Sequence, residues 1–218
     1  MKKQLNLDLY LVLDPLLCGG INGMVNTTEI AVANGVTAVQ LRSEQALTGK
    51  AWYHAALALK TALADTPVPL FINDHIDIAL AIDADGVHIG QSDLPVDVTR
   101  RLIGKDKWLG FSVSNQEQLN AVDWQQVDYL GIGPIFPTST KKDAATAMGI
   151  ELLTQQVKLK KCPAVAIGGI DINNISQVIQ TGIDGVAVVS AICGQKNVAQ
   201  ATASLINKIQ QARQEKIL

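Results

Sequence analysis

Residues 129–143 read YLGIGPIFPTSTKKD, a short apolar run followed by a polar loop. The run at 129–133 has the length and composition of a buried strand. Pro134 and Pro137 end that strand, because proline has no N–H to donate and a fixed φ. The loop then carries three hydroxyl residues and two lysines, and such donors suit a phosphate group. A solvated basic surface loop is the competing interpretation.

The rest of the chain alternates similar apolar runs with helical patterns. Strands are predicted at 8–14, 37–42, 70–73, 86–90, 108–113, 129–133, 164–169 and 185–189. Helices are predicted at 21–34, 46–64, 75–82, 95–103, 114–122, 150–160, 173–180 and 197–213. Strict alternation favours parallel strands, and eight units close a (β/α)8 TIM barrel. An open doubly wound sheet is the alternative, but the first predicted strand ends in Asp14-Pro15 without the Gly-x-Gly-x-x-Gly motif.

Composition narrows the class of protein. A chain of 218 residues with 48% hydrophobic and 17% charged residues is expected to form one domain over residues 1–218. A net charge of −2 and 4% aromatic residues argue against a nucleic-acid partner. Cys18, Cys162 and Cys193 are far apart in the sequence, which predicts neither a disulfide framework nor a zinc site and favours the cytoplasm. No apolar run approaches the roughly 18 residues of a membrane span.

Polar residues gather where the predicted strands end. The C-terminal ends of barrel strands carry the functional site, so these residues predict a site on one face. His88 lies inside a strand and is interpreted as core or wall. No cysteine, serine or lysine nucleophile is expected beside an activating base. The candidate residues are Gln40, Arg42, Asn73, Asp74, Gln91, Asp93, Ser112, Thr138, Ser139, Thr140, Lys141, Lys142, Gly168, Gly169 and Ser190.

Two anion sites follow from this distribution. Asp74 and Asp93 end neighbouring strands, which lie about 4.8 Å apart in a sheet. Two carboxylates there suit Mg²⁺ bound to substrate phosphate oxygens, although each could instead cap the next helix. Glycines at 168–169 and 182–185 flank the last two strands, where many barrels bind a phosphate through loop amides. Asp171 follows the first of these glycine pairs and could cap the next helix.

Several segments resemble the thiamine phosphate synthase family. The loop after the sixth strand and the Asn-Asp…Gly-Gln-x-Asp-Leu-Pro pair are the most specific matches, whereas AIGGI is common in phosphate-binding barrels. The matching segments are QLR (40–42), FINDHIDIALAIDADGVHIGQSDLP (71–95), GFS (110–112), GPIFPTSTKKDA (133–144), AIGGI (166–170) and GVAVVSAI (185–192).

The resemblance implies coupling of an aminopyrimidine methyl diphosphate to a thiazole phosphate, with release of diphosphate. It implies that Mg²⁺ is held by Asp74 and Asp93, and that Lys141, Ser112 and Arg42 are catalytic. The residues implied for the pyrimidine diphosphate are Gln40, Arg42, Asn73, Ser112 and Lys141. Those implied for the thiazole phosphate are Thr138, Ser139, Thr140, Gly169, Val189 and Ser190.

One position departs from the family pattern. The family usually reads Gln-x-Arg-Glu-Lys after the second strand, whereas this chain has Ser43-Glu44 in the last two places. An inward Glu44 would repel a diphosphate by a few kcal/mol, on the order expected for like charges at short range. Two other functions therefore stay open: a thiazole tautomerase-like isomerase, or a phosphate-binding barrel without catalysis. A homo-oligomer is also compatible with the sequence.

Overall fold

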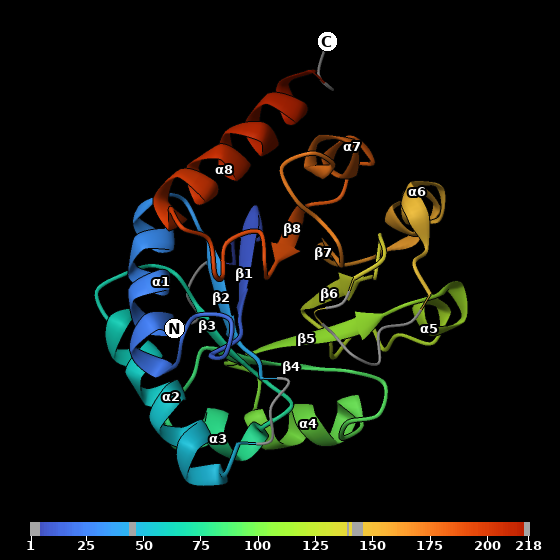
Figure 1. Ribbon diagram of the computed structural model, residues 1–218. Coiled ribbons are helices and arrows are strands. Elements are labelled where there is room, and N and C mark those ends of the chain that lie inside the picture. Colours follow the sequence, from blue (N-terminus) through green and yellow to red (C-terminus); the bar gives the residue numbers. More distant parts are fainter. Residues whose placement is uncertain (1–4, 44–46, 139, 141–145, 216–218) are drawn as a thin grey trace.

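The computed structural model describes residues 5–43, 47–138, 140 and 146–215. Eight parallel strands pair in chain order, and β1 also pairs with β8, so the sheet closes into a barrel. The helices lie outside the strands and surround them (Figure 1). The predicted (β/α)8 barrel is therefore confirmed.

Each predicted element is present, with small shifts at its ends. The strands are β1 Leu9–Leu13, β2 Ala38–Leu41, β3 Leu70–Asn73, β4 Gly86–Ile89, β5 Trp108–Val113, β6 Tyr129–Ile132, β7 Ala164–Ile167 and β8 Gly185–Val188. The helices are α1 Ile21–Ala33, α2 Gly49–Ala62, α3 Ile76–Ala81, α4 Val96–Ile103, α5 Gln116–Asn120, α6 Gly149–Leu159, α7 Ile175–Gln180 and α8 Val198–Glu215.

Two of the shifts have a visible cause in the capping residues. The helix expected at 46–64 begins at Gly49 because the hydroxyl of Thr48 accepts a hydrogen bond from the N–H of Ala51. The helix expected at 114–122 begins at Gln116 because the Asn115 side chain accepts from the N–H of Gln118 at 2.9 Å. None of the described helices is both long and apolar enough to cross a membrane.

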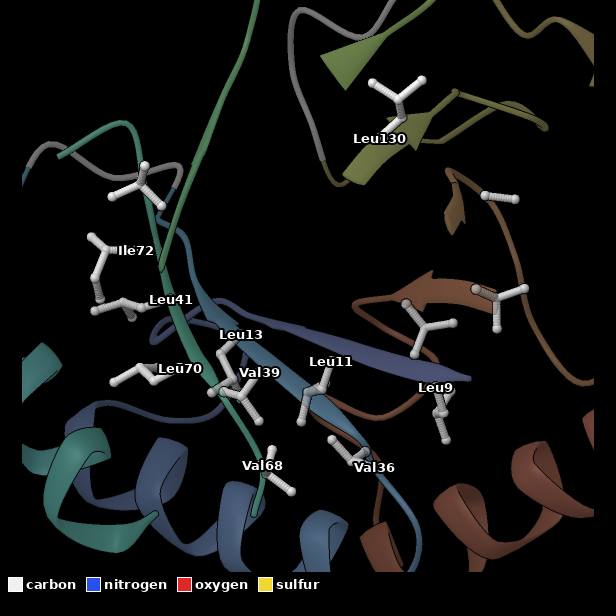
Figure 2. Close-up of a cluster of buried hydrophobic side chains, with 14 of the residues drawn as sticks. Leu9, Leu11, Leu13, Val36, Val39, Leu41, Val68, Leu70, Ile72 and Leu130 are labelled. Atoms are coloured by element: carbon white, nitrogen blue, oxygen red, sulfur yellow. The ribbon is translucent and has the colours of Figure 1, made fainter. Parts of the chain in front are cut away.

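The main hydrophobic core lies between the barrel and its helices. Alternate residues of each strand point outward, as the two-residue period of a strand requires. Figure 2 shows Leu9, Leu11 and Leu13 of β1 pointing from the strands toward the helices, together with Leu70 and Ile72 of β3. These side chains are fully buried, so the outer layer supplies most of the apolar burial that stabilises the fold.

A second, smaller cluster fills the inside of the barrel. The rings of Tyr10, Phe71 and Tyr129 pack against one another, with centroids 5.2–6.0 Å apart. Gln40 and His88 are buried polar residues on strands of the same barrel. These aromatic rings thus fill the interior of the barrel, so room for a ligand is left toward the C-terminal ends of the strands.

A repeated hydrogen bond lies at the N-terminal ends of the strands. The residue just before each even-numbered strand accepts, through its side chain, from an N–H at the start of the preceding strand. Asp85 accepts from Leu70 at 2.9 Å, and Asp128 accepts from Leu109 at 2.7 Å. We call the four contacts of this kind strand-start hydrogen bonds. The acceptors are Thr37, Asp85, Asp128 and Asp184, and the donors are Leu9, Leu70, Leu109 and Ala164. They satisfy backbone donors that would otherwise be lost at the strand ends.

Candidate active site

A cavity of about 1220 Å³ opens at the C-terminal ends of the strands. Its walls come from the ends of the strands and from the loops that follow them. The predicted site residues that line it are Gln40, Arg42, Asn73, Asp74, Gln91, Asp93, Ser112, Thr138, Thr140, Gly168, Gly169, Val189 and Ser190. The predicted residues Ser139, Lys141 and Lys142, like Glu44, lie outside the described residues. The predicted site residues at the C-terminal strand ends that the structure describes therefore face one shared space.

The two carboxylates lie on adjacent loops of this cavity. Asp74 follows β3 directly, has a φ of 60°, and accepts a 2.6 Å hydrogen bond from the amide of Asn73. Asp93 accepts a 2.6 Å hydrogen bond from the N–H of Gly90 and so closes the turn after β4. Neither caps a helix, since the residues at the starts of α3 and α4 are His75 and Pro95, without side-chain caps. Helix capping is therefore the wrong interpretation for both.

The chemistry of this pair fits magnesium. Both groups supply hard carboxylate oxygens at the mouth of one cavity, and Mg²⁺ typically takes one or two protein carboxylates and completes its shell with water and phosphate oxygens. Among the described residues there is no cluster of three or more His, Cys, Asp or Glu that would form an all-protein metal cage. Two carboxylates would leave other positions of such an ion open to water and phosphate oxygens.

The glycine pair after β7 brings two loops into close contact. Gly168 and Gly169 have φ values of 101° and 64°, in the region that favours glycine. A Cβ at Gly168 would lie 2.5 Å from Cβ of Pro134, and the N–H of Phe136 donates to the carbonyl of Gly168 at 3.0 Å. The loop after β6, which carries Thr138, is thereby held against the loop after β7, so both can contact one ligand.

The second glycine pair does not belong to the site. Gly182 and Gly185 lie at the N-terminal end of β8, where a Cβ at Gly185 would overlap the carbonyl of Leu7. The prediction that they help bind phosphate is wrong, because the signal was spacing near a strand and did not say at which end. Asp171 also differs from the prediction: it accepts from the N–H of Asn173 in the turn before α7.

Residues 9–192 match the family model described as thiamine monophosphate synthase. The chain belongs to the thiamine monophosphate synthase family. It is 47% identical over 205 residues to the thiamine-phosphate synthase of Laribacter hongkongensis, covering 94% of this chain and 96% of the relative. It is 43% identical over 213 residues to that of Xanthobacter autotrophicus, covering 98% and 100%. The solved thiamine phosphate pyrophosphorylase from Pyrococcus furiosus is 34% identical, with a TM-score of 0.83 over 94% of this chain and 96% of that one.

In this member of the thiamine monophosphate synthase family, the base of the cavity contains a buried polar chain of five residues. The amide of Gln40 donates to the hydroxyl of Tyr10 at 2.9 Å, and the two tyrosine hydroxyls are 2.9 Å apart. The hydroxyl of Tyr129 lies 3.0 Å from Nδ1 of His88, and Nε2 of His88 lies 2.9 Å from Oγ of Ser112. The chain thus joins β2, β1, β6, β4 and β5 across the barrel.

The buried polar chain confirms one sequence-based interpretation and overturns another. His88 is 8% exposed and lines the cavity, so its interpretation as wall is confirmed. The expectation that no serine stands beside a possible base is wrong, because His88 contacts Ser112 directly. The two residues are 24 positions apart in sequence and meet only because β4 and β5 are neighbours in the barrel. Tyr10 and Tyr129 also line or underlie the site without having been predicted in it.

Burial favours the neutral form of the two tyrosines. Both rings are fully buried in the described structure, and this burial raises the pKa of Tyr10 and of Tyr129 well above the ordinary tyrosine value. Hydrogen bonding with Tyr129 and Gln40 opposes the rise in the pKa of Tyr10, but burial dominates. Both hydroxyls therefore keep their protons at neutral pH.

Proposed function

We propose that this chain is a thiamine phosphate synthase. It couples 4-amino-2-methylpyrimidine-5-methyl diphosphate to a thiazole phosphate and releases diphosphate. The observation that carries the proposal is the shared cavity: all described residues assigned to the two substrates line it. Membership of the thiamine monophosphate synthase family supports the same reaction.

The diphosphate end of the site is formed after β2, β3 and β5. Arg42 and Ser112 supply donors to the leaving group, and Lys141 adds a second positive charge. Gln40 and Asn73 hold the pyrimidine. Donors that are already in position when negative charge develops lower the barrier without reorganisation.

Asp74 and Asp93 would hold Mg²⁺ at this end. The ion would supply positive charge to the diphosphate as it leaves. The residues themselves position that charge: the hydrogen bonds from Asn73 to Asp74 and from Gly90 to Asp93 fix one oxygen of each carboxylate.

The thiazole phosphate would lie against the loops after β6, β7 and β8. The residues assigned to it are Thr138, Ser139, Thr140, Gly169, Val189 and Ser190. With the phosphate held there, the thiazole nitrogen would attack the pyrimidine carbon from which the diphosphate departs. Departure of diphosphate before attack needs no protein nucleophile. Residues 1–218 act as one domain in this proposal.

The test is release of diphosphate by the purified protein. We expect release only when both substrates and Mg²⁺ are present, and none when either substrate is omitted. If no diphosphate is released at saturating substrate concentrations, the proposal is refuted. Turnover of a thiazole carboxylate phosphate to its tautomer, with no coupling, would instead support the isomerase.

Position 44 gives a second, independent test of the same assignment. Glu44→Lys restores the residue usual in the family. If the diphosphate binds beside this position, the variant lowers KM for the pyrimidine diphosphate and leaves KM for the thiazole phosphate unchanged. Equal changes in both values would show that position 44 does not face the diphosphate.

A further inference from the structure

Each hydrogen bond of the buried polar chain uses one proton. Four hydrogen bonds join Gln40, Tyr10, Tyr129, His88 and Ser112. If Gln40 donates at one end, the Tyr10 proton goes to Tyr129 and the Tyr129 proton goes to Nδ1 of His88. A neutral imidazole carries a single N–H, so its proton must then lie on Nε2 and point to Ser112.

This direction leaves Ser112 as a donor toward the cavity. Its oxygen accepts from His88, so its own hydrogen is not used within the chain. In the reverse direction, Ser112 would donate to His88, and lone pairs would face the cavity. A diphosphate requires donors, because its oxygens are acceptors only. The orientation of the Gln40 amide at one end and the anion at the other end therefore favour the same direction.

The strands leave space for this chain. A Cβ at Gly110 would overlap Nδ1 of His88 and the Tyr129 ring, and a Cβ at Gly131 would lie 3.1 Å from Cε1 of His88. Gly110 pairs with His88 on one side and with Tyr129 on the other. Two strand positions without side chains thus allow the imidazole to reach both partners.

We propose that Tyr10 and Tyr129 fix His88 as the Nε2–H tautomer, and that His88 in turn orients the Ser112 hydroxyl as a donor to the leaving diphosphate. All three are positioning residues. The role of Ser112 in this statement rests on the proposed function. The arrangement resembles a serine–histidine pair with a third orienting group, but its proton direction is opposite to that of a nucleophile and its base. Ser112 is held as a donor and is not activated for attack.

The tautomer is tested directly, without any assay of activity. Nitrogen NMR of protein labelled with ¹⁵N-histidine distinguishes the two ring nitrogens, and the His88 signals are those absent from a His88→Asn sample. At about pH 8, above the ordinary histidine pKa, we expect an unprotonated Nδ1 and a protonated Nε2. In Tyr129→Phe we expect a mixture of the two tautomers. A wild-type Nδ1–H tautomer would overturn the proposal.

A double-mutant cycle tests whether the chain acts through Ser112. Tyr129→Phe is expected to lower kcat about tenfold, less than the loss of a whole donor, with little change in KM for the thiazole phosphate. In a Ser112→Ala background the same change should alter kcat by less than about twofold, because its target is gone. Additive effects would overturn the proposal. Tyr53→Phe on α2, outside the chain, is the matched control and should leave kcat unchanged.

The two tests separate this proposal from the proposed function. If the wild-type protein releases no diphosphate, the synthase assignment fails, while the NMR spectrum still decides the proton direction. If diphosphate is released but the cycle is additive, the synthase assignment stands and the positioning role is lost.

Discussion

Gly110 of β5 stands so close to Tyr129 of β6 that no other side chain fits between them. A Cβ at Gly110 would overlap Cζ and the hydroxyl oxygen of Tyr129 as well as Nδ1 of His88. The overlapping atoms belong to two fully or largely buried rings, which cannot move aside easily. The smallest residue is therefore required at this strand position for packing and for the buried polar chain together.

Gly110→Ala should destabilise the fold by about 1–3 kcal/mol, the usual effect of overpacking a core, and should also lower activity. Urea unfolding midpoints and diphosphate release measure the two effects. Gly49→Ala is the matched control, because a Cβ there meets nothing within 4 Å and the position lies in the first turn of α2. That control should be neutral or stabilising by about 0.5–1 kcal/mol. Equal stability of the two variants would contradict the packing argument.

Asp74→Asn and Asp93→Asn should each lower activity by about tenfold or more and raise the Mg²⁺ concentration needed for half-maximal rate. Asparagine can accept the hydrogen bond from Gly90, and it tolerates the positive φ of Asp74, so the fold should be preserved. Asp77→Asn, on the exposed side of α3, is the control and should behave like the wild type. Chelation of Mg²⁺ should abolish wild-type activity. Activity that persists under chelation would refute a magnesium role.

Asp128→Ala should lower stability and leave the chemistry intact. Asp128 accepts from Leu109 and forms a 2.6 Å ion pair with Arg100, far from the cavity. Loss of these charged hydrogen bonds should cost about 2–3 kcal/mol, read from urea midpoints. The exposed Asp106→Ala is the control and should stay within about 0.5 kcal/mol. A large fall in kcat of folded Asp128→Ala would mean that this end of the barrel takes part in the reaction.

Gln156→Met should stabilise the protein by about 1 kcal/mol. The Gln156 side chain is fully buried in α6, and within the described part of the chain neither of its amide atoms has a hydrogen-bond partner. A buried amide without partners costs free energy that an apolar side chain of similar length avoids. Thermal and urea unfolding measure the gain. Destabilisation instead would reveal that the amide is satisfied.

Alkaline pH should unfold the protein through its buried tyrosines. Burial raises the pKa of Tyr10 and Tyr129 in the folded protein. Below about pH 10, the ordinary tyrosine pKa, the folded and unfolded chains both keep these protons, so the two residues do not reduce the free energy of unfolding. Above that pH the unfolded chain ionises first, and stability falls as pH rises toward the folded-state pKa. Phenolate absorbance of these two residues should therefore appear together with unfolding. Ionisation of Tyr10 or Tyr129 while the protein is still folded would contradict this prediction.

The fold could be predicted from the sequence because its signals are local. Each strand is a short apolar run that ends at a glycine, proline or polar residue, and eight such runs alternate with helical patterns. The ends of the helices were less certain, since a single capping side chain decides them. At 114–122 the sequence offered Ser114 or Asn115 as the cap, and Asn115 holds that position in the structure.

The site could be predicted in part. Residues at strand ends, such as Asp74 and Asp93, follow from the rule that the C-terminal ends of barrel strands carry the chemistry. The buried polar chain could not be found this way. Tyr10 and Tyr129 have the composition of ordinary core residues, and their contact across 119 positions depends on the curvature of the closed barrel. The one signal was the pair of glycines on β5 and β6, Gly110 and Gly131, whose missing side chains leave space for the His88 ring.

The strand-start hydrogen bonds divide the barrel into four quarters of two strands each. Each pair of strands has one such hydrogen bond at its N-terminal end. The acceptors Thr37, Asp85, Asp128 and Asp184 occupy equivalent positions in the four pairs. The candidate site lies at the C-terminal ends of the strands, and these four stabilising hydrogen bonds lie at the N-terminal ends. Substitutions in the loops at the C-terminal ends can then change ligand specificity during evolution, because they leave the hydrogen bonds that stabilise the other end of the barrel in place.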